Sequence, residues 1–157
     1  MLSESVQANV SQVLASRKHL PGALLPILHG IQDAVGHIPR EAVDEIAREL
    51  NLSRAEVHGV VTYYHYFRCE PAARHVVQIC RAEACQSMGA EALWAHACAH
   101  LGSDGHGLTK DGAFTLEPVY CLGLCSSSPA MTVDEKVHGR VGHEKFDRLV
   151  ELARAQG

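Results

Sequence analysis

Long apolar runs, basic clusters and aromatic side chains are scarce in this sequence. No stretch reaches the ~18–20 consecutive apolar residues of a transmembrane helix, so direct membrane insertion is not expected. The chain has 14 lysines and arginines against 18 aspartates and glutamates, and it has no basic run, which argues against a nucleic-acid partner. The first residues lack the charged and apolar regions of a signal peptide. We therefore expect a soluble, cytoplasmic protein.

Motifs that carry catalysis or nucleotide binding are also missing. The glycine-rich stretch 102–112 does not fit the G-x-G-x-x-G dinucleotide pattern, and neither a P-loop nor G-x-S-x-G occurs. His96 and His100 stand four residues apart, but no glutamate follows His96, so the His-Glu-x-x-His zinc motif is absent. We interpret both as partly solvated histidines and keep a metal site as the alternative. No active site is expected within the chain.

Helical periodicity characterises the first part of the chain. Apolar residues recur at helical spacing over 3–17 and 23–35. A third helix is expected to open at Pro39, because proline suits the first turn of a helix. The sequence Ser53-Arg-Ala-Glu56 is a capping box, which predicts the start of a fourth helix. Such short amphipathic helices depend on packing against one another, which favours a helical bundle.

The pattern changes to mixed helix and strand after residue 70. Strands are expected at 75–79, 114–120, 129–133 and 137–141, helices at 89–101 and near the C-terminus, and a loop at 102–112. Pro118 interrupts the second strand, so that strand is expected at an edge or to carry a bulge.

The predicted fold class is α/β. An N-terminal helical bundle at 1–70 precedes a second domain at 71–157 with the order β-α-β-β-β-α. This order is the one expected of a thioredoxin-like α/β domain.

Six cysteines in a protein expected in the cytoplasm argue for metal or redox chemistry and against structural disulfides. Cys80 and Cys85 form one short pair, and Cys121 and Cys125 form another. Each pair follows a predicted strand, so two loops can meet at one end of a sheet. Four thiolates in two pairs suit the two irons of a 2Fe–2S cluster. We predict that these four cysteines ligate one such cluster.

Three other uses of these cysteines compete with a cluster. Structural zinc and a thioredoxin-type dithiol both favour Cys-x-x-Cys, and both gaps here are longer. Unligated buried thiols are common, but two pairs that each close a strand argue against coincidence. Cys98 lies on the apolar face of a predicted helix and is expected in the hydrophobic core. Cys69 stands alone near the domain boundary. A zinc-stabilised adaptor module is the alternative from a different class.

Residues around the second pair bear on the properties of a bound cluster. Gly123 lets the backbone turn tightly and brings amide N–H groups close to the sulfur atoms. Leu122 and Leu124 are expected to shield the site from water.

The aromatic block Tyr63–Phe67 holds three of the four tyrosines. We interpret it as core packing between the helical and α/β parts. A partner interface is the alternative.

The chain resembles the thioredoxin-like 2Fe–2S ferredoxin subunits of NADH-linked enzymes. The resemblance covers almost the whole chain and rests on five segments: Gly36-His-Ile-Pro-Arg-Glu-Ala, Val57-His-Gly-Val-Val-Thr-Tyr-Tyr, Cys80-x4-Cys85, Cys121-Leu-Gly-x-Cys125 and Ser128-Pro-Ala-Met. It implies an electron-transfer subunit with one 2Fe–2S cluster. The family includes the small peripheral-arm subunit of respiratory complex I and subunits of NAD-reducing hydrogenases.

Within this family, the flanking residues are most similar to the gamma subunit of NAD-dependent, molybdenum-containing formate dehydrogenase. Three segments carry that similarity: Val61-Thr-Tyr-Tyr-His-Tyr-Phe-Arg68, Cys121-Leu-Gly-Leu-Cys-Ser-x-Ser-Pro-Ala130 and Val137-His-Gly-Arg-Val141. It implies two partners, a flavin- and NADH-binding subunit and a formate dehydrogenase catalytic subunit, and it places FMN, NAD and the molybdenum cofactor on those partners alone. The equivalent subunit of complex I (NADH:quinone oxidoreductase) or of an NAD-reducing hydrogenase is the alternative.

Overall fold

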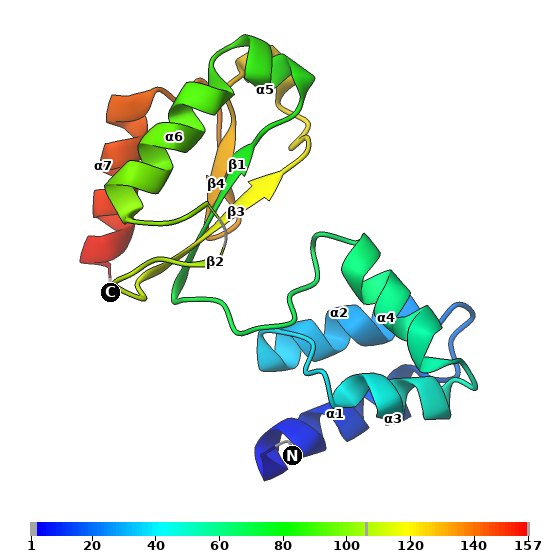
Figure 1. The fold of residues 1–157 in the computed structure, drawn as a ribbon. Helices are drawn as coiled ribbons and strands as arrows, with labels where there is room; N and C mark the ends of the chain where they lie inside the picture. The colour runs from blue at the N-terminus through cyan, green and yellow to red at the C-terminus, as the bar shows by residue number, and fades with distance from the viewer. Residues whose placement is uncertain (1–2, 106, 157) are drawn as a thin grey trace. The chain divides into compact units, whose positions relative to one another are not determined.

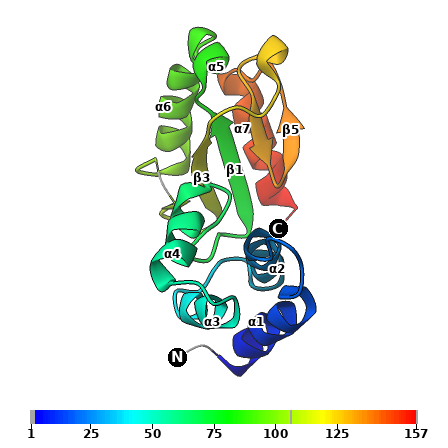
Figure 2. The same cartoon turned by 90° about the vertical axis from the view of Figure 1, so that its right-hand side faces the viewer.

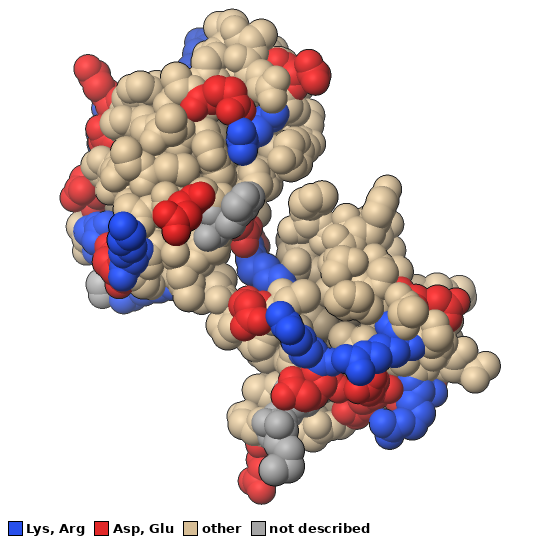
Figure 3. Space-filling model, in the orientation of Figure 1, with Lys and Arg blue, Asp and Glu red and all other residues tan. Residues whose placement is uncertain are grey.

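The computed structural model describes residues 3–105 and 107–156 (Figure 1). It divides into two compact units, Met1–Pro71 and Ala72–Gly157. Within the described residues, no helix has both the length and the apolar character needed to cross a membrane. On the face shown in Figure 3, lysine and arginine side chains lie interspersed with aspartates and glutamates.

The described part of the first unit contains four helices, as the sequence predicts. They are α1 (Glu4–Arg17), α2 (Leu24–Val35), α3 (Ala42–Glu49) and α4 (Arg54–Tyr63). Their apolar faces meet in one core, because none of these short helices is stable without its neighbours. Fully buried members of this core include Val10, Ile27, Leu28, Ile31 and Ile46.

The ends of two helices show how local sequence sets their bounds. The predicted capping box opens α4: Ser53 Oγ accepts from the Glu56 N–H at 3.2 Å, and the Glu56 carboxylate accepts from the Ser53 N–H at 2.7 Å. The start expected for α3 at Pro39 is wrong. The residues after Pro39 form a turn in which the Ala42 N–H donates to the Pro39 carbonyl at 3.0 Å, and the helix begins at Ala42.

A five-stranded mixed sheet lies at the centre of the second unit. Its elements in chain order are β1 (His75–Cys80), α5 (Glu83–Ser87), α6 (Ala90–Leu101), β2 (Gly107–Leu108), β3 (Phe114–Val119), the 3-10 helix η1 (Cys125–Ser127), β4 (Met131–Val133), β5 (Lys136–His138) and α7 (His143–Ala155). The strand order is β2-β3-β1-β4-β5, with β1 parallel to β3 and antiparallel to β4. The fold is the expected mixed α/β, thioredoxin-like ferredoxin fold.

Helices α6 and α7 lie side by side on one face of the sheet (Figures 1 and 2). They close a core with the central strands, and its fully buried side chains include Val77, Ile79, Leu116, Phe146 and Val150. This packing leaves the loops at the ends of β1 and β3 free to form a site.

Two short elements were not expected. The helix α5 lies inside the first cysteine loop, where five residues are too few to show a helical period. Strand β2 lies inside the stretch 102–112, which was expected to be a loop. It pairs with β3 through Gly107 and Leu108, a contact set by the tertiary fold.

The strand β5 ends at His138, whereas the sequence predicts a strand through Val141. The regular strand ends before Arg140, which has a left-handed φ of 49°, and the backbone continues beside the segment that precedes β4. The Arg140 N–H donates to the Ser127 carbonyl at 2.6 Å, and the Val141 N–H donates to the Pro129 carbonyl at 2.9 Å. These residues therefore brace the second cysteine loop.

The expectation for Pro118 is confirmed, because it lies at a local sheet edge. It is opposite Ile79 of β1, and the described residues of β2 pair only with Thr115 and Leu116 of β3. The Val119 carbonyl points toward the β1 side of β3, where it accepts a hydrogen bond from the Arg81 N–H at 2.8 Å. Since neighbouring residues of a strand point their N–H groups to opposite sides, the missing N–H of Pro118 faces the side where β2 has ended.

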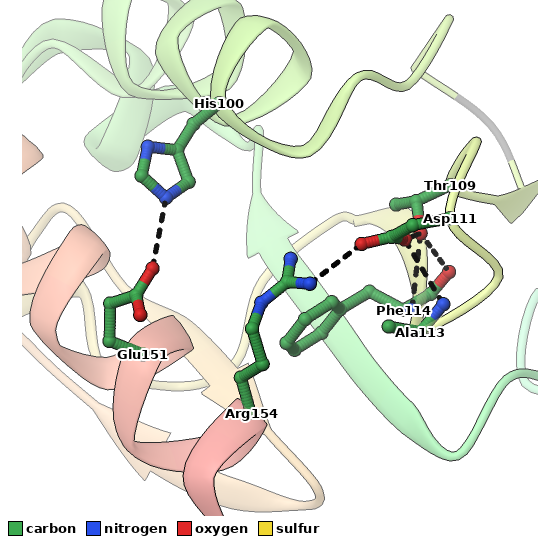
Figure 4. Close-up of polar contacts among 7 residues, drawn as sticks. All are labelled: His100, Thr109, Asp111, Ala113, Phe114, Glu151 and Arg154. Atoms are coloured by element: carbon green, nitrogen blue, oxygen red, sulfur yellow. Dashed lines mark hydrogen bonds and ion pairs between the residues drawn. The ribbon is translucent and has the colours of Figure 1, made fainter.

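The turn between β2 and β3 is held by Asp111 (Figure 4). Its carboxylate accepts from the Thr109 hydroxyl at 2.6 Å, the Ala113 N–H at 3.1 Å and Arg154 Nη1 of α7 at 2.7 Å. These hydrogen bonds, from Thr109 first, hold the pKa of Asp111 well below its usual range. The contact with Arg154 also ties the turn to α7.

Replacing Asp111 by asparagine is expected to lower the thermal stability of the second unit at neutral pH. Because the native state depresses this pKa, the carboxylate contributes full stability above the ordinary aspartate range and loses it as the pH falls through the native value. The difference in melting temperature between wild type and Asp111→Asn should therefore shrink from pH 7 to pH 3. Asp104→Asn, an exposed position in the same loop, is the matched control. A difference that stays constant across this range would contradict the prediction.

Candidate metal centre

Two loops at one end of the sheet carry the four predicted ligands. Cys80 is the last residue of β1, and Cys85 follows in α5. Cys121 comes shortly after β3, and Cys125 is the first residue of η1. Because β1 and β3 are parallel neighbours, with Cys80 opposite Val119, both loops leave the sheet at the same end.

The four thiols are arranged as two pairs. The Cys121 and Cys125 Sγ atoms are 3.7 Å apart, and the Cys85 thiol hydrogen-bonds with Cys80. Cys80 and Cys85 are each 2% exposed, whereas Cys121 and Cys125 are exposed. The site therefore has a buried side and a solvent side.

The pairing fits two metal ions better than one. A single tetrahedral zinc, with Zn–S bonds of about 2.3 Å, would hold all its thiolates about 3.8 Å from one another. Among the described residues, no three of these thiol sulfurs lie within 4.8 Å of one another. Two separated thiol pairs match the two irons of a 2Fe–2S cluster, each of which takes two protein sulfurs.

Backbone N–H groups converge on the buried thiol of Cys80. Burial raises the pKa of this thiol, but N–H groups of Ala82, Cys121 and Leu122 and the Cys85 thiol hydrogen-bond to it and lower its pKa overall. Stabilising a thiolate in a buried position prepares it to bind a metal cation.

The exposed thiol of Cys125 has a raised pKa. The cause is Cys121, through a hydrogen bond and its charge, followed by burial and by the charges of Cys85 and Cys80. All four cysteines are thus close enough to repel one another as thiolates. A bound cation would relieve that repulsion, so the donor set fits a metal centre.

The backbone of the second loop adopts an uncommon conformation at a predicted ligand. Cys121 has a φ of 87°, in the region that favours glycine, and Gly123 has a φ of 76°. The Gly123 N–H points to Cys121 Sγ at 3.4 Å. A non-glycine residue held there costs about 1–3 kcal/mol, and such outliers occur at functional sites.

Apolar groups surround the buried half of the site. Cys80 and Cys85 pack with the buried Ala90 and Ala130, and the partly buried Leu122 and Leu124 lie against this cluster. The leucines therefore lie against the buried pair of thiols, and their shielding role stays a prediction.

Ser128 is a site residue for which the sequence predicted no separate role. It is buried, its hydroxyl donates to the Cys125 carbonyl at 2.8 Å, and the Cys85 thiol lies 3.5 Å from the hydroxyl oxygen. Ser128 thus connects the two cysteine loops. Its place beside Pro129, in the segment after the last cysteine, was the only sequence signal.

The remaining cysteines lie apart from the four. Cys98 packs partly buried against the core of the second unit, and burial raises its pKa. Cys69 packs against the core of the first unit, where it lines a cavity with Ile38 and Val43. The core position expected for Cys98 is confirmed.

Most of the aromatic block is exposed in the structure. Tyr63 is 75% exposed, and Tyr64 and Tyr66 are 43% and 46% exposed. Only Phe67, at 8%, belongs to the core of the first unit. The ring of Tyr66 lies 4.9 Å from that of His29. Packing between the two units and a partner interface both stay predictions.

Comparison with known proteins places similar chains in redox complexes. The family model for thioredoxin-like [2Fe-2S] ferredoxin matches residues 10–154. One NADH-quinone oxidoreductase subunit of Rhizobium meliloti (strain 1021) is 38% identical over 133 residues, which cover 85% of this chain and 79% of that protein. The NADP-reducing hydrogenase subunit HndA of Solidesulfovibrio fructosivorans is 30% identical over 141 residues, with 90% and 82% covered.

A solved NAD+-reducing [NiFe]-hydrogenase in the air-oxidised state has a similar fold. Its TM-score is 0.70 at 25% identity, and the match covers 89% of this chain. This chain spans only 24% of that hydrogenase chain, so the similarity concerns one part of a longer subunit.

Proposed function

Because this chain belongs to the thioredoxin-like [2Fe-2S] ferredoxin family, we propose that it is an electron-transfer subunit that holds one 2Fe–2S cluster on Cys80, Cys85, Cys121 and Cys125. The observation that carries the proposal is the arrangement of these four thiols in two pairs at one end of the sheet. When bound, the cluster supplies a centre that takes up and releases one electron at a time.

The chain's own residues set the environment of that centre. The cysteine thiolates bind the irons, and the N–H groups near Cys80 and Cys121 stabilise negative charge on sulfur, which favours the reduced state. Leu122 and Leu124 limit access of water on the buried side. The exposed pair, Cys121 and Cys125, lies toward solvent, where a partner's redox group can approach.

The partner is a flavin- and NADH-binding subunit. This assignment rests on the resemblance to subunits of NADH-linked enzymes and on the relatives named NADH-quinone oxidoreductase and NADP-reducing hydrogenase. Electrons would pass singly between that flavin and this chain. The exposed tyrosines of the first unit, Tyr63, Tyr64 and Tyr66, offer an aromatic contact surface for a subunit of the complex.

A more specific part of the proposal concerns which enzyme complex contains this subunit. The residues flanking the cysteines favour a cytoplasmic, molybdenum-containing formate dehydrogenase with NAD as the second substrate. The matched relatives favour NADH-quinone oxidoreductase or a hydrogenase at least as well. The cluster-bearing role is the same in all three enzymes, and the metal of the catalytic partner distinguishes them.

Purification of the complex through this chain tests both levels of the proposal. The chain is expected to co-purify with a flavoprotein, and its visible spectrum is expected to bleach when NADH is added. Molybdenum in the complex would identify formate dehydrogenase, nickel would identify a hydrogenase, and NADH-dependent quinone reduction would identify the complex I type. A chain that is isolated alone and never equilibrates with NADH through any partner contradicts the proposal.

A further inference from the structure

A second group of potential metal ligands lies between α6 and α7, apart from the cysteines. Two histidines from α6, His96 and His100, face Asp147 of α7. One ligand atom from each of these three residues lies within 4.8 Å of the other two. Six residues into a helix correspond to about 9 Å of rise, so His96 lies well along α6 from its cysteine end.

The two histidines converge on one carboxylate oxygen of Asp147. His96 Nε2 lies 2.6 Å from Asp147 Oδ1, and His100 Nδ1 lies 3.3 Å from the same atom. Their side chains are 27%, 31% and 38% exposed, so water and ions reach the group while its residues remain partly enclosed. Glu151, one turn further along α7, lies 4.0 Å from His100 Nε2 and adds a second carboxylate (Figure 4).

Neighbouring rings hold the imidazoles in place. The ring of His143 stacks parallel on that of His96, with centroids 4.3 Å apart. The buried ring of Phe146 meets the rings of His96 and His100 edge-on, at 5.8 and 5.9 Å. Such packing restricts the side-chain rotamers of the two histidines.

The sequence contains the pattern that produces this convergence. His96 and His100 are four residues apart on α6, and His143, Asp147 and Glu151 repeat the same spacing on α7. Residues four apart share one face of a helix. Because α6 and α7 pack side by side, the two faces meet, which neither spacing reveals alone.

We infer that His96, His100 and Asp147 form a binding site for a transition-metal dication of the zinc type. Two imidazoles and one carboxylate are the donors that zinc takes in sites that keep a position open to water. The carboxylates supply the negative charge that balances the cation. Without a metal, the same groups hydrogen-bond across the helix pair; with one, they would link α6 to α7.

Zinc titration of the protein as purified, with its cysteine-bound metal in place, tests this site. We expect one additional equivalent of Zn²⁺ to bind by calorimetry, to raise the melting temperature of the second unit, and to leave the visible spectrum unchanged. The doubly substituted variant His96→Gln/His100→Gln should bind at least about 10–100-fold more weakly, the range seen when supporting residues of metal sites are changed. Asp147→Asn, which keeps a hydrogen-bonding side chain, should also bind more weakly.

The matched control is His19→Gln/His58→Gln, which removes two exposed histidines of the first unit and should bind zinc as wild type does. Metal-dependent shifts of the His96 and His100 ring nitrogens in NMR spectra of the wild type report ligation without any substitution. The inference is overturned if the wild type binds no additional zinc, if the double variant binds equally well, or if binding bleaches the visible spectrum in step.

Discussion

The Cys80→Ala variant is expected to lose the 2Fe–2S cluster. Cys80 is the buried thiol on which three backbone N–H groups converge, and its removal leaves one iron with a single protein thiolate. Iron and sulfide content should fall from about two of each per chain to near zero, with loss of visible absorption and of NADH-dependent reduction.

Cys98→Ala is the matched control, because it is the same Cys-to-Ala change at another cysteine of the second unit. Cys98 packs partly buried against the core that contains α6 and is not one of the four predicted ligands, so this variant should retain a full cluster. Full iron content in Cys80→Ala would exclude Cys80 as a ligand. A colourless wild type that carries one zinc would instead favour the adaptor module.

Replacing Gly139 by alanine is expected to destabilise the second unit and to reduce cluster retention. A Cβ atom at this position would lie 2.8 Å from Ser127 Cβ and 2.9 Å from the Ser127 carbonyl oxygen. Ser127 ends η1, which begins at the proposed ligand Cys125. Overpacking of this kind costs about 1–3 kcal/mol. For a unit of this size, each kcal/mol lowers the melting temperature by about 4–8 °C.

Gly142→Ser provides the control for Gly139→Ala. A Cβ atom at Gly142 meets no atom within 4 Å, and this residue is the N-cap of α7, where serine is favoured. Gly139→Ala should therefore have both a lower melting temperature and a lower iron content than Gly142→Ser. Equal melting temperatures and equal iron contents in both variants would show that contact with the Ser127 segment does not support the site.

Local patterns were sufficient to predict most of the helices and to single out the two cysteine pairs that the structure brings to one end of the sheet. The capping box at Ser53 needs only four residues, and each cysteine pair follows a strand in the chain. Where the predicted strands differ from the observed ones, contacts with other segments of the chain set the strand bounds. Strand β2 forms because β3 lies beside it, and beyond β5 the N–H groups of Arg140 and Val141 bond to Ser127 and Pro129.

The aromatic block and the histidines show that sequence spacing also does not reveal the burial or the contacts of side chains. The spacing of Tyr63, Tyr64 and Tyr66 does not reveal which rings are buried, because the block lies at the end of α4, where helical periodicity stops. His96 and His100 had no visible third ligand, because Asp147 lies on another helix that packs against theirs.

The sequence by itself determined the fold class, the four thiols and their grouping into two pairs, because these depend on residue type and on spacing within one loop. Only the tertiary structure decided that Ser128 connects the two loops, that Gly139 must lack a side chain, and that α6 and α7 bring histidines and a carboxylate together. The physical reason is that these contacts join residues far apart in the chain. Strand pairing and helix packing create them, and no local period encodes them.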